Sequence, residues 1–444
     1  MPDHAVSSDP AVQAQLDRFA QLSPGRDILG LSRIAALMAA LGDPHDRLPP
    51  VFHVAGTNGK GSTCAFLRAA IEAAGMTCHV YSSPHLVRFN ERIRLAGSLI
   101  EDAPLAGLLA EVLDASEALD IGASFFEITT AAAFLAFART PADACIVEVG
   151  LGGRLDATNI IARPAVCGIA SLGIDHEAFL LAPENGLSDM SPLARIAYEK
   201  AGIAKPRTAI ITQKYTAAMA KQVAYQAERV AAKIRARGDA WDAAIYDGKI
   251  AYRDVKGTLK LPLPRMSGAH QADNAALAVA MLRHQNAVHV PDAALASAMQ
   301  WAHWPARLQR LGEGLMTACL PAGTQVWIDG GHNPDAGAAL AAHFAVHPAL
   351  IHLIIGMLAN KDPAAIIAPL SNYIASITVV PVPGHEHHSG DGFAQAAGTM
   401  PIHSAIDVHA ALAAITPRRG EIILIAGSLY LAGEVLRANG EIPA

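Results

Sequence analysis

The sequence predicts an α/β protein of two domains, each built on a mostly parallel sheet. Three observations lead to this prediction. From residue 51 onward, short apolar runs rich in β-forming residues alternate with segments of helical period, which is typical of strands joined by covering helices. The chain has 444 residues, too many for one ordinary core. Hydrophobic residues make up 52% of it and charged residues 17%, so two cores can be filled.

The first domain is expected to alternate strands and helices from residue 51 onward. It begins with a strand at 51–55, a helix at 62–74 and a strand at 77–82. Because the strands read as continuous apolar runs, we expect a parallel sheet covered on both faces. The later elements are a helix at 126–138, strands at 145–149 and 165–170, a helix at 193–201 and a strand at 208–212.

The pattern changes after residue 240. Alternating segments between 241 and 264 surround Asp247-Gly248 and Lys256-Gly257, so we expect antiparallel hairpins as a small edge of the first domain, with helices at 271–283 and 292–299 behind them. Pro305 breaks the helical pattern, and we place the boundary between residues 1–304 and 305–444. The second domain is expected to be a smaller Rossmann-like unit with strands at 324–328, 351–355, 377–382 and 422–425.

The turn after the first strand carries the strongest functional signal, Gly56-Thr57-Asn58-Gly59-Lys60-Gly61-Ser62. Glycines let backbone N–H groups approach phosphate oxygens, the following helix N-terminus adds partial positive charge, and Lys60 adds a full one. The spacing departs from GxxxxGK[ST], because Gly61 separates Lys60 from the hydroxyl of Ser62. An ordinary glycine-rich turn is the alternative. The lysine, the hydroxyls and the flanking elements favour a nucleoside triphosphate site, which makes the first domain a P-loop nucleotide-binding domain.

Composition narrows the class of partner. The net charge is −6 and no basic tract is present, which argues against a general nucleic-acid or anionic-membrane surface. The five cysteines are scattered, without CxxC spacing, as expected for buried thiols in a reducing compartment. The first twenty residues lack the apolar core of a signal peptide, and no apolar run has membrane-spanning length. We therefore expect a cytoplasmic protein.

Polar side chains also follow three other expected strands. Ser83 follows the strand at 77–82, Glu148 lies at the end of 145–149, and His176 follows 165–170. Ligands gather at the carboxyl ends of parallel strands, so these groups are expected to converge on phosphate-bound magnesium. A serine cap, a surface glutamate and a satisfied histidine are the simpler interpretations of each residue alone. Their shared position favours function for the set.

A series of longer strings spans nearly all of the chain in order: GTNGKGS, YSSPHL, FNERIR, EVGLGGRLDATN, DH, YEKAGI, PARLQ, DGGHNP and GSLYLAGEV. In this combination the chain resembles bacterial dihydrofolate synthase/folylpolyglutamate synthase, a family of Mur-ligase-like amide ligases. GTNGKGS alone would fit any of these ligases, whereas SSPHL with EVGLGGRLDATN and EKAGI indicates the folate branch.

The resemblance implies an ATP-driven ligation. ATP converts the carboxylate of dihydropteroate or tetrahydrofolate into an acyl phosphate, the amine of L-glutamate attacks it, and phosphate leaves, with Mg²⁺ as the metal. Together with the net charge of −6 and the absence of a basic tract, this leads us to expect a monomer that binds small molecules and neither nucleic acid nor a membrane. A cleft between the two domains is the natural place for such a site.

The resemblance also implies roles for single residues. The residues expected to bind the triphosphate are Thr57, Gly59, Lys60, Gly61 and Ser62, and those expected to bind the metal are Ser83, Glu148 and His176. Further contacts with ATP are expected from Asn274, Arg307 and Asp329. His332 is expected near the triphosphate, where it would take part in the transfer chemistry. Lys200 matches a lysine that is carbamylated in this family, which would turn an ammonium into an anion facing magnesium. The alternative for Lys200 is a helix-surface lysine paired with Glu199.

For the pterin, the resemblance implies Leu29, Gly30, Ser124, Phe125, Phe126, Glu127, Leu155, Asp156 and Ala157. A phenylalanine would offer a ring face and Asp156 an acceptor for pterin N–H groups, although one of the two phenylalanines is expected in the core. Ile28 departs from the polar residue common in bifunctional members, and 180–193 is longer than the usual turn. The run His385-Glu386-His387-His388 looks like a metal site by composition, but we interpret it as a solvated loop.

Two other functions stay open. One is a Mur-type ligase acting on another carboxylate, such as a cell-wall precursor, for which SSPHL and GLGGRLDATN give no support. The other is a nucleotide-binding homologue that has lost catalysis, which the full set of expected site residues disfavours.

Overall fold

The computed structural model describes residues 5–22, 29–182, 187 and 189–443. Within it the chain forms two compact units, and the second begins at Trp304, beside Pro305. The short segment Met266–Gln271 groups with the second unit, and Ala272–His303 returns to the first. Residues 183–186 of the long segment before Lys200, and Ile28, lie outside the described residues.

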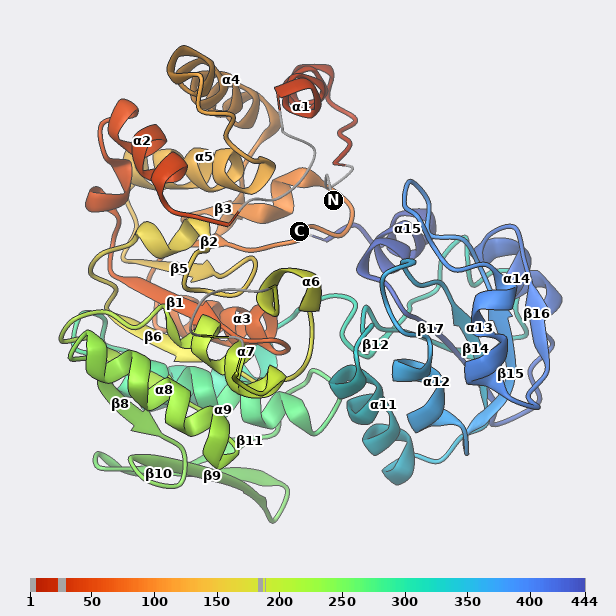
Figure 1. Ribbon diagram of the computed structural model, residues 1–444. Helices are drawn as coiled ribbons and strands as arrows, with labels where there is room; N and C mark the ends of the chain where they lie inside the picture. Colours follow the sequence, from red (N-terminus) through yellow and green to blue (C-terminus); the bar gives the residue numbers. More distant parts are fainter. Residues whose placement is uncertain (1–4, 23–28, 183–186, 188, 444) are drawn as a thin grey trace. The chain divides into compact units, whose positions relative to one another are not determined.

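The first unit contains an eight-stranded sheet in the order β4-β3-β2-β5-β1-β6-β7-β8 (Figure 1). The strands from β2 to β8 along this order are parallel, and β3 and β4 add an antiparallel edge beside β2. Their bounds are β1 Val51–Ala55, β2 Cys78–Tyr81, β3 Ile93–Leu95, β4 Ser98–Leu99, β5 Ala144–Glu148, β6 Val166–Ile169, β7 Ala209–Thr212 and β8 Lys233–Ala236. The predicted hairpins are present as β9 Trp241–Tyr246, β10 Lys249–Asp254 and β11 Gly257–Pro262, and they form a separate sheet.

Helices cover both faces of the large sheet. One face packs α1, α2, α4 and α5 over β2 and β5, and α7 and α8 over β6 and β7 (Figure 1). On the opposite face, Gly168 of β6 leaves room for Met281 of α9, because a Cβ there would overlap the Met281 sulfur. The helices are α1 Pro10–Leu22, α2 Ser32–Ala40, α3 Lys60–Ala73, α4 Asp102–Leu119, α5 Phe125–Arg139, α6 Glu177–Leu180, α7 Pro192–Ala201, α8 Ala217–Arg229, α9 His270–Arg283 and α10 Asp292–Trp301, with 3-10 turns Pro44–Arg47, Phe89–Arg92 and Ala157–Ile160.

The second unit is a six-stranded sheet in the order β12-β13-β17-β14-β15-β16, parallel except for β12. The strands are β12 Gln309–Arg310, β13 Gln325–Ile328, β14 Ile351–Ile355, β15 Ile374–Val379, β16 Ile402–Ser404 and β17 Ile422–Ala426. The helices are α11 Pro334–Val346, α12 Ala364–Leu370, α13 Gly390–Ala397, α14 Val408–Ala414 and α15 Leu429–Asn439. Because β17 lies between β13 and β14, strand order reverses there, and the carboxyl ends of these strands form the usual ligand-binding edge.

Cysteine burial matches the expectation for most of the thiols. Cys64, Cys78, Cys145 and Cys167 are buried, and burial raises the pKa of each thiol. Cys319 is exposed. Among the described helices, none combines the length and the apolar character needed to cross a membrane.

Candidate functional site: a nucleotide loop and its neighbours

The turn between β1 and α3 has the conformation that its glycines predict. Gly56 and Gly59 adopt φ of 155° and 83°, where other residues are strained. A Cβ on Gly56 would lie 2.9 Å from the Cβ of Ala170, and a Cβ on Gly59 would overlap the Asn274 amide oxygen. Asn274 on α9 therefore lies directly against the turn, where the resemblance places a nucleotide contact.

The loop after β6 holds this turn in place. The Thr57 N–H donates to the Ser171 carbonyl at 2.7 Å, and the Thr57 hydroxyl donates to the Gly173 carbonyl at 2.9 Å and accepts from the Gly173 N–H at 3.1 Å. The Ser171 hydroxyl donates to the Asn58 carbonyl at 3.1 Å. The Thr57 side chain thus contributes to loop structure, and Lys60 and Ser62 at the start of α3 bring charge and hydroxyl to the turn.

Two lysines reach the same turn. Lys60 Nζ lies 3.4 Å from the Thr57 carbonyl, and Lys200 Nζ donates to the Gly56 carbonyl at 3.0 Å. Lys200 is only 4% exposed. Burial, reinforced by the charge of Lys60, lowers the pKa of Lys200 to about 7. The surface-lysine alternative does not describe this geometry, because Lys200 is buried and the bidentate partner of Glu199 is Arg154.

Two of the expected metal ligands lie at the carboxyl ends of the adjacent strands β2 and β5, and the third, His176, follows β6 on the other side of β1. Ser83 follows β2, Glu148 ends β5 and is 4% exposed, and β5 is paired with β1 so that Glu148 stands opposite Val54. His176 caps α6 with φ of 53°, and 42% of its side chain is exposed. Among the described residues there is no group of three or more His, Cys, Asp or Glu side chains arranged to hold a metal. A hydroxyl, a carboxylate and an imidazole are chemically suitable for magnesium completed by phosphate oxygens.

The expected pterin residues on α5 form an aromatic wall. Ser124 caps the helix, with Glu127 accepting from its N–H at 2.8 Å and pairing with Arg33 at 3.0 Å. Phe125 and Phe126 are both half-buried, so neither is a fully buried core residue. Phe125 packs against Phe19 and Phe89, while Phe126 packs against Tyr81 and directly under Gly150.

Asp156 has a local structural role. Its carboxylate accepts from the Leu151 N–H at 2.8 Å and the Thr158 N–H at 3.0 Å, and it also bonds the Thr158 hydroxyl. Burial raises its pKa. A carboxylate offers about four lone-pair directions, so most are used within this loop and few remain for a pterin N–H. Beside it, Leu155 is half-buried and Ala157 is buried. Leu29 and Gly30, just before α2, are both half-buried.

In the second unit, Asp329 organises the segment around Arg307. Its two carboxylate oxygens accept from the Leu308 N–H and the Gly331 N–H, both at 2.7 Å. Ala306 and Leu308 adopt φ of 55° and 43°, so Arg307 stands between two residues in the left-handed region. His332 Nδ1 lies 3.0 Å from the Gly330 carbonyl. The expected site residues Arg307, Asp329 and His332 thus lie together at the carboxyl end of β13.

In the histidine-rich run, Glu386 and His387 are exposed, whereas His385 and His388 are half-buried. His388 Nε2 lies 2.7 Å from the Lys361 carbonyl, and the His385 ring stacks on Tyr430 at 3.9 Å between centroids. Sequence reasoning did not single out Arg154, Asn159, Glu199 or Ser171 as contributors to the site. Arg154, Asn159 and Glu199 stand inside the motifs quoted above, but their roles depend on contacts between segments distant in sequence.

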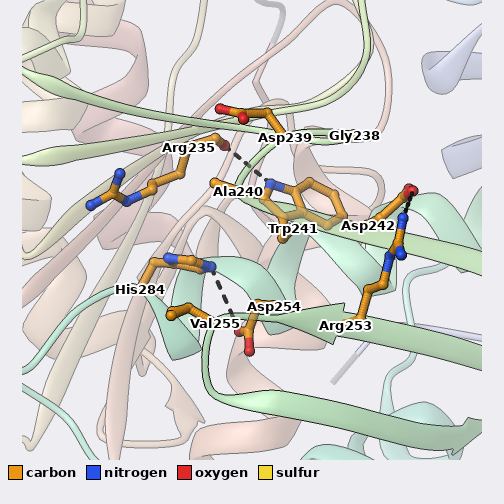
Figure 2. A pocket seen from close by; sticks show the side chains of 10 residues that line it. All are labelled: Arg235, Gly238, Asp239, Ala240, Trp241, Asp242, Arg253, Asp254, Val255 and His284. Carbon is orange, nitrogen blue, oxygen red and sulfur yellow. Dashed lines mark hydrogen bonds and ion pairs between the residues drawn. The ribbon is translucent and has the colours of Figure 1, made fainter.

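Two hollows lie away from these residues. One, of about 610 Å³, is bordered by β10, the loop before β9 and the end of α9 (Figure 2). The other, of about 780 Å³, is lined by Arg310–Thr324 residues of the second unit. None of the expected site residues lines either one.

Comparisons with known proteins agree with this architecture. No protein-family model matches the chain. The dihydrofolate synthase/folylpolyglutamate synthase of Bacillus subtilis is 32% identical over 438 residues, covering 91% of this chain and 94% of that protein. Escherichia coli FolC in complex with DHPP and ADP superposes with a TM-score of 0.84 at 31% identity, over 97% of each chain. A bifunctional folylpolyglutamate synthase/dihydrofolate synthase with Mn, AMPPNP and L-glutamate bound superposes with a TM-score of 0.83 at 28% identity, over 97% and 99%.

The fold and the nucleotide loop therefore define a ligase of the α/β class, as predicted. Within that class, the chain belongs to the dihydrofolate synthase/folylpolyglutamate synthase family. The resemblance seen in the motifs is confirmed.

Proposed function

We propose that this chain is an ATP- and Mg²⁺-dependent ligase that joins L-glutamate to dihydropteroate, forming dihydrofolate, and to tetrahydrofolate, forming folylpolyglutamates. The observation that carries the proposal is the position of Lys200. Lys200 is buried, and its amine donates a hydrogen bond to the Gly56 carbonyl of the nucleotide loop. A lysine with only a surface role would instead keep its charged amine in solvent. Relatives that carry both activities in their names support the choice of substrates.

The reaction proceeds through an acyl phosphate. A carboxylate oxygen of the folate substrate attacks the γ-phosphorus of ATP, and ADP leaves. The glutamate amine then attacks the acyl carbon, loses a proton, and expels inorganic phosphate as the amide forms. The task of the protein is positioning and charge stabilisation. Lys60, with Thr57, Asn58, Gly59, Gly61 and Ser62, holds the triphosphate.

Ser83, Glu148, His176 and Lys200 are the proposed magnesium-binding residues. Magnesium, when bound, neutralises developing charge on the phosphate oxygens. Lys200 contributes as a carbamate: its neutral amine adds carbon dioxide and releases a proton, which converts a cation into an anion. The lowered pKa of Lys200 supports this step, because only the neutral amine reacts.

The remaining roles divide between the two units. We assign ATP binding to residues 1–304 and glutamate ligation to residues 305–444, with Asn274, Arg307 and Asp329 contacting the nucleotide and His332 assisting phosphate transfer. Phe125 and Phe126 give the pterin an apolar wall, with Ser124, Glu127, Leu29 and Gly30 beside it. Leu155, Asp156 and Ala157 shape the loop next to that wall, and Asp156 acts mainly through its backbone contacts.

An assay of ADP formation tests the function. The enzyme is incubated with Mg²⁺ and ATP and with dihydropteroate, tetrahydrofolate or a cell-wall nucleotide peptide, each with and without L-glutamate. We expect ADP and phosphate only with the two folate acceptors. AMP and pyrophosphate would contradict the acyl-phosphate route. Turnover of the peptide would indicate a Mur-type ligase for another carboxylate, and no turnover would indicate an inactive homologue. Light scattering checks the proposed monomer, and cell fractionation checks a cytoplasmic location.

A further inference from the structure

Two distant segments of the first unit interlock beside the nucleotide loop. One is the loop after β5, which carries Gly153 and Arg154, and the other is the end of α7, which carries Glu199 and Gly202. The Arg154 N–H donates to the Glu199 carbonyl at 2.8 Å. The Asn159 side-chain amide bridges the two segments by donating to the Arg154 carbonyl at 2.9 Å and the Gly202 carbonyl at 3.1 Å.

A bidentate ion pair closes the interlock. Arg154 Nε lies 3.0 Å from Glu199 Oε2 and Arg154 Nη2 lies 2.9 Å from Glu199 Oε1. The Glu199 side chain is 6% exposed, and the Arg154 guanidinium lies over the Tyr198 ring at 5.5 Å. Two parallel N–H···O bonds fix direction as well as distance, which a lysine at this position could not do.

The two joined segments also carry or adjoin residues of the proposed site. Glu199 immediately precedes Lys200, whose amine donates to the Gly56 carbonyl of the nucleotide loop. On the other segment, Glu148 and Asp156 flank Arg154 in sequence. A Cβ on Gly153 would approach the Glu199 and Lys200 carbonyls at 3.0 Å, so the backbones are already as close as they can pack. Movement of either segment therefore moves the other.

We propose that Arg154 is a positioning residue for the ligation: through its ion pair with Glu199 it fixes the Lys200 amine against the nucleotide loop. This inference rests on the proposed function, which gives Lys200 its task beside the nucleotide. Without the bidentate ion pair between Arg154 and Glu199, the fold remains but the Lys200 amine can move away from the nucleotide loop. The expected consequence is slower turnover and weaker divalent-metal binding with little change in folate binding.

The first unit contains a matched control. Arg283 forms a bidentate pair with Asp254, both contacts at 2.8 Å, with the Asp254 side chain fully buried. Arg283 also lies over a tyrosine, Tyr252, at 5.7 Å. This pair belongs to the hairpin region, where Asp254 borders the hollow drawn in Figure 2, and it contacts none of the proposed site residues. If both ion pairs only stabilise the fold, variants of the two pairs should have the same effects on kcat, Mn²⁺ affinity and melting temperature.

The experiment compares Arg154→Lys with Arg283→Lys, and Glu199→Gln with Asp254→Asn. For each full-length variant, kcat and KM are measured with tetrahydrofolate, ATP and L-glutamate. Binding of Mn²⁺ to the enzyme with AMPPNP is measured by electron paramagnetic resonance, which does not depend on turnover. Melting temperature reports on the fold.

We expect Arg154→Lys to lower kcat and Mn²⁺ affinity about tenfold or more, with KM for tetrahydrofolate little changed. Glu199→Gln should do the same. The two control variants should melt earlier while kcat and Mn²⁺ affinity stay at the wild-type value. If both pairs affect only melting temperature, or all four variants lose kcat alike, Arg154 is not a positioning residue. A wild type that forms no glutamate-dependent ADP would instead overturn the proposed function, and the Mn²⁺ measurement still separates the two pairs.

Discussion

At the scale of the residue, burial changes the chemistry of Lys200 in the range of neutral pH. Its pKa, lowered to about 7, leaves roughly half of the amines uncharged near neutral pH. We expect activity in buffers depleted of carbon dioxide to fall at pH 6, where the ammonium form dominates, and bicarbonate to restore it. Lys200→Ala should be inactive at every pH, with partial rescue by small carboxylates. Full activity of that variant would contradict the carbamate.

Lys60 is expected to matter for rate and little for folding. Its amine has only a long contact, 3.4 Å to the Thr57 carbonyl. Lys60→Ala should therefore leave the melting temperature almost unchanged while removing about 3 kcal/mol or more of transition-state stabilisation. Steady-state kinetics at saturating ATP checks this, with the exposed Lys221→Ala on α8 as the control. Near wild-type kcat would contradict the phosphate-loop assignment.

His53 in the middle of β1 should make the native state sensitive to acid. It is fully buried, with Nε2 2.9 Å from the Thr158 hydroxyl, and burial lowers its pKa to about 3. As the pH falls below about 6.5, His53 becomes protonated in the unfolded chain, whereas in the native state it stays neutral down to about pH 3. The free energy of unfolding therefore decreases as the pH falls through this window. Melting temperatures at pH 4.5 and 7 should differ less for His53→Gln than for the wild type. The exposed His289→Gln should behave like the wild type.

At the scale of the element, the fold was predictable where strands and turns have local signals. The strand, glycine-rich turn and helix of residues 51–73 follow from their own sequence. In the second unit, β13, β14 and β17 match the predicted strands, β15 lies three residues earlier than predicted, and the short strands β12 and β16 were not predicted. The edge strands β3 and β4 and helix α4 were not predicted. Short edge strands have too few residues for a clear alternation, and α4 shows a weak difference between its faces.

The site shows the same division. Lys60 and Glu148 could be proposed from their positions after predicted strands, whereas Lys200 was proposed only through the resemblance to the ligase family, and their roles stay predictions. The ion pair between Arg154 and Glu199 could not be proposed, since it joins residues 45 positions apart that meet only in the folded chain. The hydrogen bonds that Asp156 accepts within its loop were also beyond sequence reasoning, and its contact with the pterin stays a prediction.

Two glycines on different elements should respond to alanine in opposite directions. A Cβ on Gly202, at the end of α7, would overlap the Arg154 backbone and side chain, so Gly202→Ala should destabilise by about 1–3 kcal/mol. Gly107 lies on the exposed surface of α4 with nothing within 4 Å of an added Cβ. Gly107→Ala should stabilise by up to about 1 kcal/mol, because alanine favours the helix. Urea unfolding measures both, and a stable Gly202→Ala would contradict the close packing described.

At the scale of the whole molecule, each of the two units has expected site residues at the carboxyl edge of a mostly parallel sheet. In the first unit the glycine-rich turn, Ser83, Glu148 and His176 lie at or after the carboxyl ends of β1, β2, β5 and β6, and in the second unit Asp329 and His332 follow β13. Other expected site residues lie on helices, Lys200 on α7 and Asn274 on α9. The chain matches structures of the family over nearly its full length, so the arrangement within each unit is that of the family fold.

The uneven burial of the cysteines provides a chemical handle. All five lie within the described residues, four are enclosed in the first unit, and Cys319 in the second is open to solvent. A thiol-specific reagent should therefore modify one sulfur in the native enzyme and five after denaturation, by titration with Ellman's reagent and peptide mapping. Fast modification of a second thiol in the native enzyme would contradict that burial. A single maleimide-bearing fluorophore would then report on the second unit alone, without any engineered cysteine, while ATP, folate and glutamate are added in turn.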